Sequence, residues 1–122
     1  MIEVKNVYKG YRKEPVLKDV SLTVVQGEIH GLIGENSAGK TTLIKCMTGI
    51  YRTDSGEILY DGEPVFDNPK VKERIGYVAD YNEYIGSNTI KQMVKMYQIF
   101  YSGFDCEKFN DYNEIFKLPV DK

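Results

Sequence analysis

The stretch Gly34-Glu35-Asn36-Ser37-Ala38-Gly39-Lys40-Thr41 decides how this chain is interpreted. It matches the pattern of a glycine, four residues and then Gly-Lys-Ser/Thr. The apolar segment 29–33 predicts a short buried strand that ends at Gly34. Residues 43–50 predict a helix, because their apolar side chains recur at helical spacing. A strand, this loop and a helix, in that order, are the context in which the pattern binds phosphate.

The residues of the loop suit the chemistry of a bound nucleotide. Backbone N–H groups ahead of a helix point toward phosphate oxygens, and the helix N-terminus adds partial positive charge. Gly34 and Gly39 allow bare backbone to approach the ligand, while Lys40 places a cation between the terminal phosphates. The Thr41 hydroxyl is a ligand for Mg²⁺, and Thr42 is expected to donate to a phosphate nearer the sugar. The set of predicted nucleotide-binding residues is completed by the loop interior, Asn36, Ser37 and Ala38.

Composition and charge limit the other functions open to the chain. Its 122 residues, 42% hydrophobic and 28% charged, are typical of one globular domain, which excludes a disordered chain. The formal net charge of −2 argues against a nucleic-acid partner, and the basic group at 70–74 is interpreted as a solvated face. The two cysteines lie far apart, which indicates neither a disulfide framework nor a zinc site. No apolar run approaches the roughly 18 residues that span a bilayer, so any membrane span is expected in another chain.

Apolar patterning also predicts strands outside the loop region. The predicted strands are residues 2–8, 17–24, 57–60, 64–66 and 75–79. Asp61-Gly62 is the strongest hairpin signal in the chain, and it joins two of these strands. Gly49 is predicted to end the loop helix. The expected result is a pair of antiparallel hairpins on either side of the loop helix.

The C-terminal part predicts two amphipathic helices. The first begins after Asn88 or Thr89, either of which would cap it. Its apolar face comprises Ile90, Val94, Tyr97 and Tyr101. The second runs from about 105 to 117, and its apolar stripe comprises Phe109, Tyr112, Ile115 and Phe116. We expect these aromatic residues to be mainly the core of two short helices, with Tyr81 and Tyr84 better placed for partner contact.

Taken in order and spacing, these segments resemble the ATPase subunits of ATP-binding cassette (ABC) transporters over the whole chain. Residues 6–21 resemble the family's opening hairpin, whose aromatic residue stacks on adenine, and the matching position is Tyr11. Segment 27–34 resembles the strand into the loop, and 54–62 resembles the hairpin after the loop helix. The resemblance implies an adenine platform at Tyr11. A surface or packing role for Tyr11 stays open, because the chain has ten tyrosines.

The resemblance implies a fold and a function. The fold class is α/β of the P-loop nucleoside triphosphate hydrolase type, with N-terminal antiparallel β hairpins, part of the core sheet, the loop helix and the start of a helical subdomain. Residues 1–80 would be the nucleotide-binding part and 81–122 the start of that subdomain. The chain would bind ATP and Mg²⁺ to power export, as in bacterial drug or peptide exporters. Its partners would be a transmembrane permease and a second ATPase subunit, at the cytoplasmic face of the cell membrane.

Three departures from the family pattern qualify this expectation. Ser37 stands where the family usually has glycine, which would cost roughly 1 kcal/mol if that position needs positive φ. Asp80 stands where the family has a glutamine near Mg²⁺, and a metal-associated role and a plain loop carboxylate are both open. The signature motif, the acidic strand and the switch histidine have no counterpart before Lys122, so no catalytic residue is assignable. Without their sheet neighbours, these residues alone are expected to expose apolar surface.

Two alternatives remain. The first is a small P-loop kinase or GTPase, which gives no reason for the hairpin that carries Tyr11. The second is a nucleotide-binding or interaction module without turnover, and for these 122 residues alone it is favoured over hydrolysis.

Overall fold

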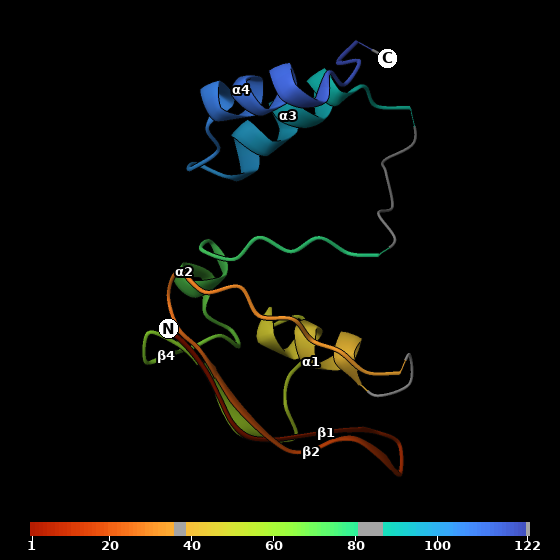
Figure 1. Cartoon of the computed structure of the whole chain (residues 1–122), viewed down its shortest axis with the longest axis vertical. Coiled ribbons are helices and arrows are strands. Elements are labelled where there is room, and N and C mark those ends of the chain that lie inside the picture. Colours follow the sequence, from red (N-terminus) through yellow and green to blue (C-terminus); the bar gives the residue numbers. More distant parts are fainter. Residues whose placement is uncertain (36–38, 81–86, 122) are drawn as a thin grey trace. The chain divides into compact units, whose positions relative to one another are not determined.

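The computed structural model describes residues 1–35, 39–80 and 87–121, and the predicted site residues Asn36, Ser37 and Ala38 lie outside that range, as do Tyr81 and Tyr84 (Figure 1). The chain forms two compact units, Met1–Tyr77 and Val78–Lys122. The first unit holds the β-sheet, and the second holds the last two described helices.

The first unit is built on a four-stranded antiparallel sheet in the order β2-β1-β3-β4. The strands are β1 (Ile2–Tyr11), β2 (Glu14–Val24), β3 (Ser55–Tyr60) and β4 (Glu63–Pro64). At the turn between β3 and β4, Asp61 and Gly62 have φ values of 50° and 84°, the left-handed conformation that this dipeptide favours in hairpins. Both predicted hairpins are therefore confirmed, although β4 is shorter than expected.

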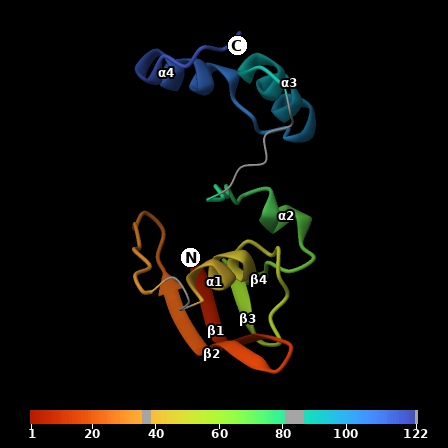
Figure 2. The ribbon, with the colours of Figure 1, turned by 90° about the vertical axis from the view of Figure 1, so that its right-hand side faces the viewer.

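Helix α1 (Lys40–Met47) lies over one face of this sheet, as Figure 2 shows. The helix ends at Met47 with Thr48 as its C-cap, and Gly49 follows with a φ of 72°, as predicted for a helix-terminating glycine. Apolar side chains from β1, β2, β3 and α1, joined by two residues that follow the sheet, form one buried core. Its members are Val4, Val7, Leu17, Leu43, Cys46, Ile58, Val65 and Val71. This packing holds the first turn of α1 against β2.

A short helix, α2 (Pro69–Lys72), lies near the C-terminal end of the first unit and was not predicted from the sequence. The Asn68 side chain accepts a hydrogen bond from the Val71 N–H at 3.4 Å, and a proline occupies the first turn. A capping residue followed by proline is a helix-start signal, so Asn68-Pro69 could have predicted α2. The basic group at 70–74 is exposed, as expected for a solvated face.

Two predicted strands are wrong. Residues 29–33 and 75–79 are not strands, and Ile29, Ile33 and Val78 have relative exposures of 101%, 96% and 86%. A buried strand requires ladder partners on its sides. The described sheet pairs only β1 to β4, and no described strand lies against either segment. The sequence also predicted that the 122 residues by themselves would expose apolar surface, and this prediction is confirmed.

The second unit contains two helices, α3 (Ile90–Phe100) and α4 (Cys106–Phe116). Thr89 caps α3 in a reciprocal pair of hydrogen bonds with Gln92, and Asp105 caps α4. The Tyr97 ring stacks on Tyr101 with centroids 5.5 Å apart. Of the two caps predicted for α3, the structure selects Thr89. Among the described residues, no helix is long and apolar enough to cross a membrane.

The side chains between α3 and α4 line an apolar pocket. They are Ile90, Met93, Val94, Tyr97, Phe104, Phe109 and Leu118. Three members of the predicted apolar face of α3, Ile90, Val94 and Tyr97, line this pocket. The predicted core role of Tyr97 and Tyr101 is wrong, because these side chains are 42% and 53% exposed. The predicted stripe of α4 is wrong beyond Phe109, because Tyr112, Ile115 and Phe116 are 59%, 73% and 69% exposed. Two short helices offer too little facing surface to bury a whole stripe.

Candidate functional site

The two ends of the predicted phosphate loop are linked by a side chain. The Lys40 ammonium donates a hydrogen bond to the Gly34 carbonyl oxygen. Lys40 is the first residue of α1, and Gly34 ends the segment that follows β2. The cation predicted to contact terminal phosphates therefore points back toward Gly34.

Gly39 is fixed by both its conformation and its neighbours. It occupies the N-cap of α1 with a φ of 86°, a left-handed conformation that side chains disfavour. A Cβ there would lie 2.9 Å from Val16 Cγ1 and 3.1 Å from Leu17 Cδ2, both on β2. The loop thus enters α1 in close contact with the sheet, and only glycine fits that approach.

Among the described residues, which exclude 36–38, no side chain caps the N-terminus of α1. The first turn of the helix contains no acidic residue. The first intrahelical bond runs from the Leu43 N–H to the Gly39 carbonyl at 2.9 Å. The N–H groups of Lys40, Thr41 and Thr42 consequently have no partner within the helix. Such a helix end attracts an anion through its donors and its dipole.

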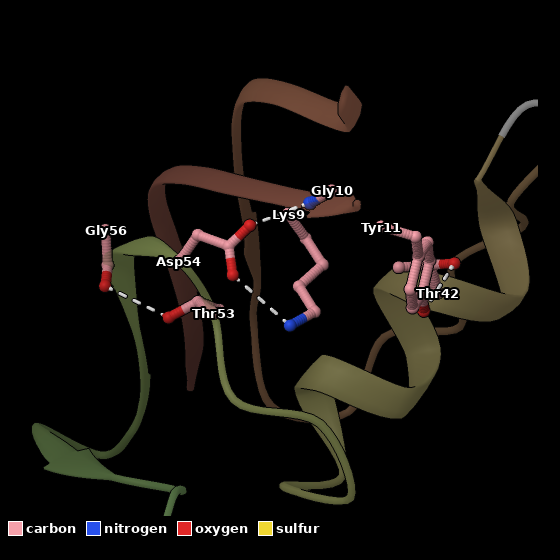
Figure 3. Close-up of polar contacts among 7 residues, drawn as sticks. All are labelled: Lys9, Gly10, Tyr11, Thr42, Thr53, Asp54 and Gly56. Carbon is pink, nitrogen blue, oxygen red and sulfur yellow. Dashed lines mark hydrogen bonds and ion pairs between the residues drawn. The ribbon is translucent and has the colours of Figure 1, made fainter. Parts of the chain in front are cut away.

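The predicted adenine platform lies beside this helix end (Figure 3). Tyr11 is the last residue of β1, and its Oη lies 3.4 Å from the Thr42 Oγ1. The Tyr51 ring meets the Tyr11 ring edge-on, with centroids 6.1 Å apart at 76°. Tyr11 is 43% exposed, so one part of its ring packs and another faces solvent. The fold thus brings together Tyr11 and Thr42, which are 31 residues apart in sequence.

Asp54, which the sequence pattern places only in a turn, makes a dense set of contacts at the end of β1 (Figure 3). Its carboxylate accepts the Gly10 N–H at 2.8 Å and the Lys9 ammonium at 3.3 Å. The Gly10 hydrogen bond, followed by the Lys9 contact, holds the pKa of Asp54 below its ordinary value. Sequence reasoning missed both Tyr51, which contacts the Tyr11 ring, and Asp54, which contacts the two residues before Tyr11.

The predicted metal ligands are not brought together within one unit. Thr41 is exposed in the first turn of α1, whereas Asp80 is an exposed residue of the second unit. The described residues also contain no group of three or more His, Cys, Asp or Glu side chains that could hold a metal ion. A protein cage for Mg²⁺ is absent from this part of the chain.

Comparison with known proteins gives consistent results. The family model described as ABC transporter matches residues 17–117. The ABC transporter ATP-binding protein YtrB of Bacillus subtilis (strain 168) is 39% identical over all 122 residues, which span 42% of YtrB. The ribose import ATP-binding protein RbsA of Halalkalibacterium halodurans is 45% identical over 84 residues, or 68% of this chain and 17% of RbsA. The chain therefore spans less than half the length of these curated relatives.

Solved structures agree with the sequence relatives. An ATP-binding subunit of an ABC transporter superposes with a TM-score of 0.77 at 29% identity, covering 90% of this chain and 46% of that one. The ATP-binding cassette MJ0796, a dimer in a post-hydrolysis state with ADP and Pi, superposes with a TM-score of 0.74 at 28% identity. That match covers 88% of this chain and 52% of the cassette. The predicted fold class, part of an α/β P-loop fold with antiparallel hairpins, is confirmed.

Proposed function

This chain belongs to the ABC transporter family of ATP-binding proteins, and from that premise we propose that it binds MgATP through residues 34–42 to power transport. In this proposal residues 1–80 are the nucleotide-binding part of the ATPase domain, and 81–122 begin its helical subdomain.

One observation carries the proposal: the first turn of a helix, a lysine and an exposed aromatic ring meet at one place. The first turn of α1 supplies backbone donors for phosphate oxygens, and Lys40 supplies a positive charge beside them. Tyr11 lies against Thr42 of the same turn and offers a face for a base. Triphosphate and base would thus contact neighbouring parts of one site.

Mg²⁺ enters this proposal as part of the nucleotide complex. Thr41 would contribute its hydroxyl, and the phosphates would supply further oxygen ligands. Bound there, the ion neutralises charge on the terminal phosphates. Asp80 is proposed as a second metal-associated residue on the family resemblance alone.

The partners follow from the same family. A second ATPase subunit would close over the bound nucleotide, in line with the dimeric state of MJ0796. A transmembrane permease would receive the resulting motion, which places the chain at the inner face of the cell membrane. YtrB is named as the ATP-binding protein of an ABC transporter, and RbsA as a ribose import ATP-binding protein.

The direction of transport has two candidates. Export is favoured by the resemblance of residues 81–105 to the helical subdomain of bacterial exporters. Import is favoured by the similarity to RbsA over 84 residues. Co-expression with the partner permease, followed by measurement of ATP-dependent substrate uptake into inverted vesicles, separates the two. ATP-dependent uptake into those vesicles is the result expected of an exporter.

The chain by itself is proposed to bind ATP without efficient hydrolysis. Hydrolysis requires a carboxylate that polarises water and a signature loop from a second subunit, and no residue here is assigned to either role. Phosphate release from MgATP should therefore stay at the rate of the protein-free control. Turnover at a rate of about 1 per second or faster would be typical of an enzyme and would contradict this.

Calorimetric titration with MgATP tests the proposed site. Lys40→Ala should weaken ATP binding at least tenfold, because a charge-assisted contact to phosphate contributes roughly 1.5–3 kcal/mol. Lys70→Ala is the matched control, since it removes the same charge from an exposed position in the same unit. Equal affinities for the wild type and the Lys40 variant would refute the assignment of the loop.

A further inference from the structure

The β ladder is irregular where β1 approaches the candidate site. The pairing of β1 with β2 shifts register between Val7 and Lys9 and again between Lys9 and Gly10. On the other side of β1, pairing with β3 ends at Tyr8 opposite Ser55. The last residues of β1, which lead to Tyr11, therefore have ladder partners on the β2 side only.

Asp54 supplies hydrogen bonds at this place. Its backbone N–H donates to the Tyr8 carbonyl at 2.8 Å, and its carboxylate accepts the Gly10 N–H at 2.8 Å. These two hydrogen bonds continue the bonding along this edge of β1 past Tyr8, the last residue of β1 that pairs with β3. Gly10 is itself constrained from the β2 side, because a Cβ there would lie 2.8 Å from the Glu14 carbonyl oxygen. The residue immediately before Tyr11 is thus held on both sides.

The same carboxylate also orients a cation toward the aromatic ring. The Lys9 ammonium lies 3.3 Å from Asp54 Oδ1 and 5.9 Å from the Tyr11 ring centroid. A cation at that distance from a ring is attracted to its face. The Lys9 side chain is mostly covered, with an exposure of 17%, whereas the Asp54 side chain is 54% exposed, so only the cation of this pair is shielded. Asp54 therefore reaches Tyr11 by two routes, through the Gly10 backbone and through Lys9.

We propose that Asp54 is a positioning residue for nucleotide binding, which fixes the Tyr11 ring where adenine would stack while touching no nucleotide itself. This inference rests on the proposed function, because it assumes that Tyr11 contacts the base. It predicts that Asp54 affects affinity for the base and not for the phosphates. A purely structural role would weaken both alike.

The experiment compares MgATP with inorganic tripolyphosphate, which carries the phosphates but no base. Both ligands are titrated calorimetrically into the full chain and into Tyr11→Ala, Asp54→Ala, Asp54→Asn and the Tyr11→Ala/Asp54→Ala double variant. Stacking of a base on an aromatic ring contributes roughly 1–3 kcal/mol of binding free energy, so Tyr11→Ala is expected to lose about tenfold in ATP affinity. Asp54→Ala is expected to lose about threefold to fivefold, since the ring remains but is less restrained.

Asp54→Asn provides a milder change in case the alanine variant does not fold. Its amide oxygen still accepts the Gly10 N–H, but the charge that holds Lys9 is gone. An intermediate loss of ATP affinity, about twofold, is expected. Asp61→Asn is the matched control, because Asp61 is an ion-paired carboxylate at the other end of β3, bound to the N-terminus and Arg74. That variant should bind ATP as the wild type does.

The outcomes separate this inference from the proposed function. Support requires a loss in ATP affinity for Asp54→Ala, unchanged tripolyphosphate affinity, and no further loss when Tyr11 is already alanine. Equal weakening of both ligands, or a loss that adds fully to that of Tyr11→Ala, overturns the positioning role alone. If Tyr11→Ala binds ATP normally, the stacking assignment fails and this inference falls with it.

Discussion

At the scale of residues, Gly39 shows how strongly one position constrains the site. Gly39→Ala would place a Cβ 2.9 Å from Val16 Cγ1 in a backbone with a φ of 86°. We expect a loss of about 1 kcal/mol from the backbone and roughly 1–3 kcal/mol from overpacking. Gly27→Ala is the matched control, because Gly27 has a φ of 84° and no described residue other than its chain neighbours lies within 4 Å of the place its Cβ would take. Urea unfolding should show the larger loss at Gly39, and equal losses would contradict the packing argument.

Asp54 makes the stability of the folded chain depend on pH. Its pKa is lowered from 3.8 in the folded chain, chiefly by the Gly10 N–H. Its contacts therefore stabilise the fold fully above the ordinary value and are lost as the pH falls through the lowered one. Asp54→Asn should flatten the acid side of the stability curve measured by urea unfolding. Some dependence should remain, since the pKa of Asp61 is lowered too. A curve identical to that of the wild type would contradict the contact.

Some residues of the candidate site were identified from the sequence and others were missed. Lys40 was found from a local pattern, because eight consecutive positions define the phosphate loop. Asp54 was not, because its contact with Gly10 spans 44 residues and depends on where the β1 ladder becomes irregular. A turn motif such as Asp54-Ser55-Gly56 has the same local meaning whether or not its carboxylate reaches another strand.

At the scale of elements, the cap of α3 is testable in isolation from the nucleotide. Thr89→Ala removes the hydroxyl that accepts the Gln92 N–H, and it should cost about 1 kcal/mol and shorten the helix. Asn88→Ala is the matched control, since Asn88 precedes the cap and is exposed. Amide hydrogen exchange in α3 should accelerate only for the Thr89 variant. Equal exchange in the two variants would show that Thr89 does not cap the helix.

Three features stabilised by local signals were predicted correctly, whereas α2 was missed although Asn68-Pro69 is also a local signal. The Asp61-Gly62 turn, the Thr89 cap and the Gly49 terminus depend on nearby residues, and all three are in the structure. The strands at 29–33 and 75–79 were predicted from apolar composition, but a strand forms only with a ladder partner. Composition therefore indicated where burial was favourable without supplying the neighbour that would bury it.

At the scale of the whole molecule, the exposed apolar side chains predict association. Large apolar residues are more than two thirds exposed in both units. They are Ile29, Ile33, Val78, Ile99, Phe100, Ile115 and Phe116. The chain should bind a hydrophobic dye and form concentration-dependent oligomers in sedimentation experiments. Phe100→Ser and Phe116→Ser together should reduce dye binding, whereas Lys95→Ser, on α3, should not. A monomer without dye binding at micromolar concentration would contradict this.

The central claim is that the first turn of α1 binds the phosphates of ATP. Amide NMR spectra recorded during titration with MgATP test it most directly, because each backbone N–H reports its own environment. We expect the largest shifts at Gly39, Lys40 and Thr41, smaller shifts near Tyr11, and loss of both sets in Lys40→Ala. Tripolyphosphate should reproduce the first set and not the second. Largest shifts in α3 or α4, or none at the first turn of α1, would contradict the claim.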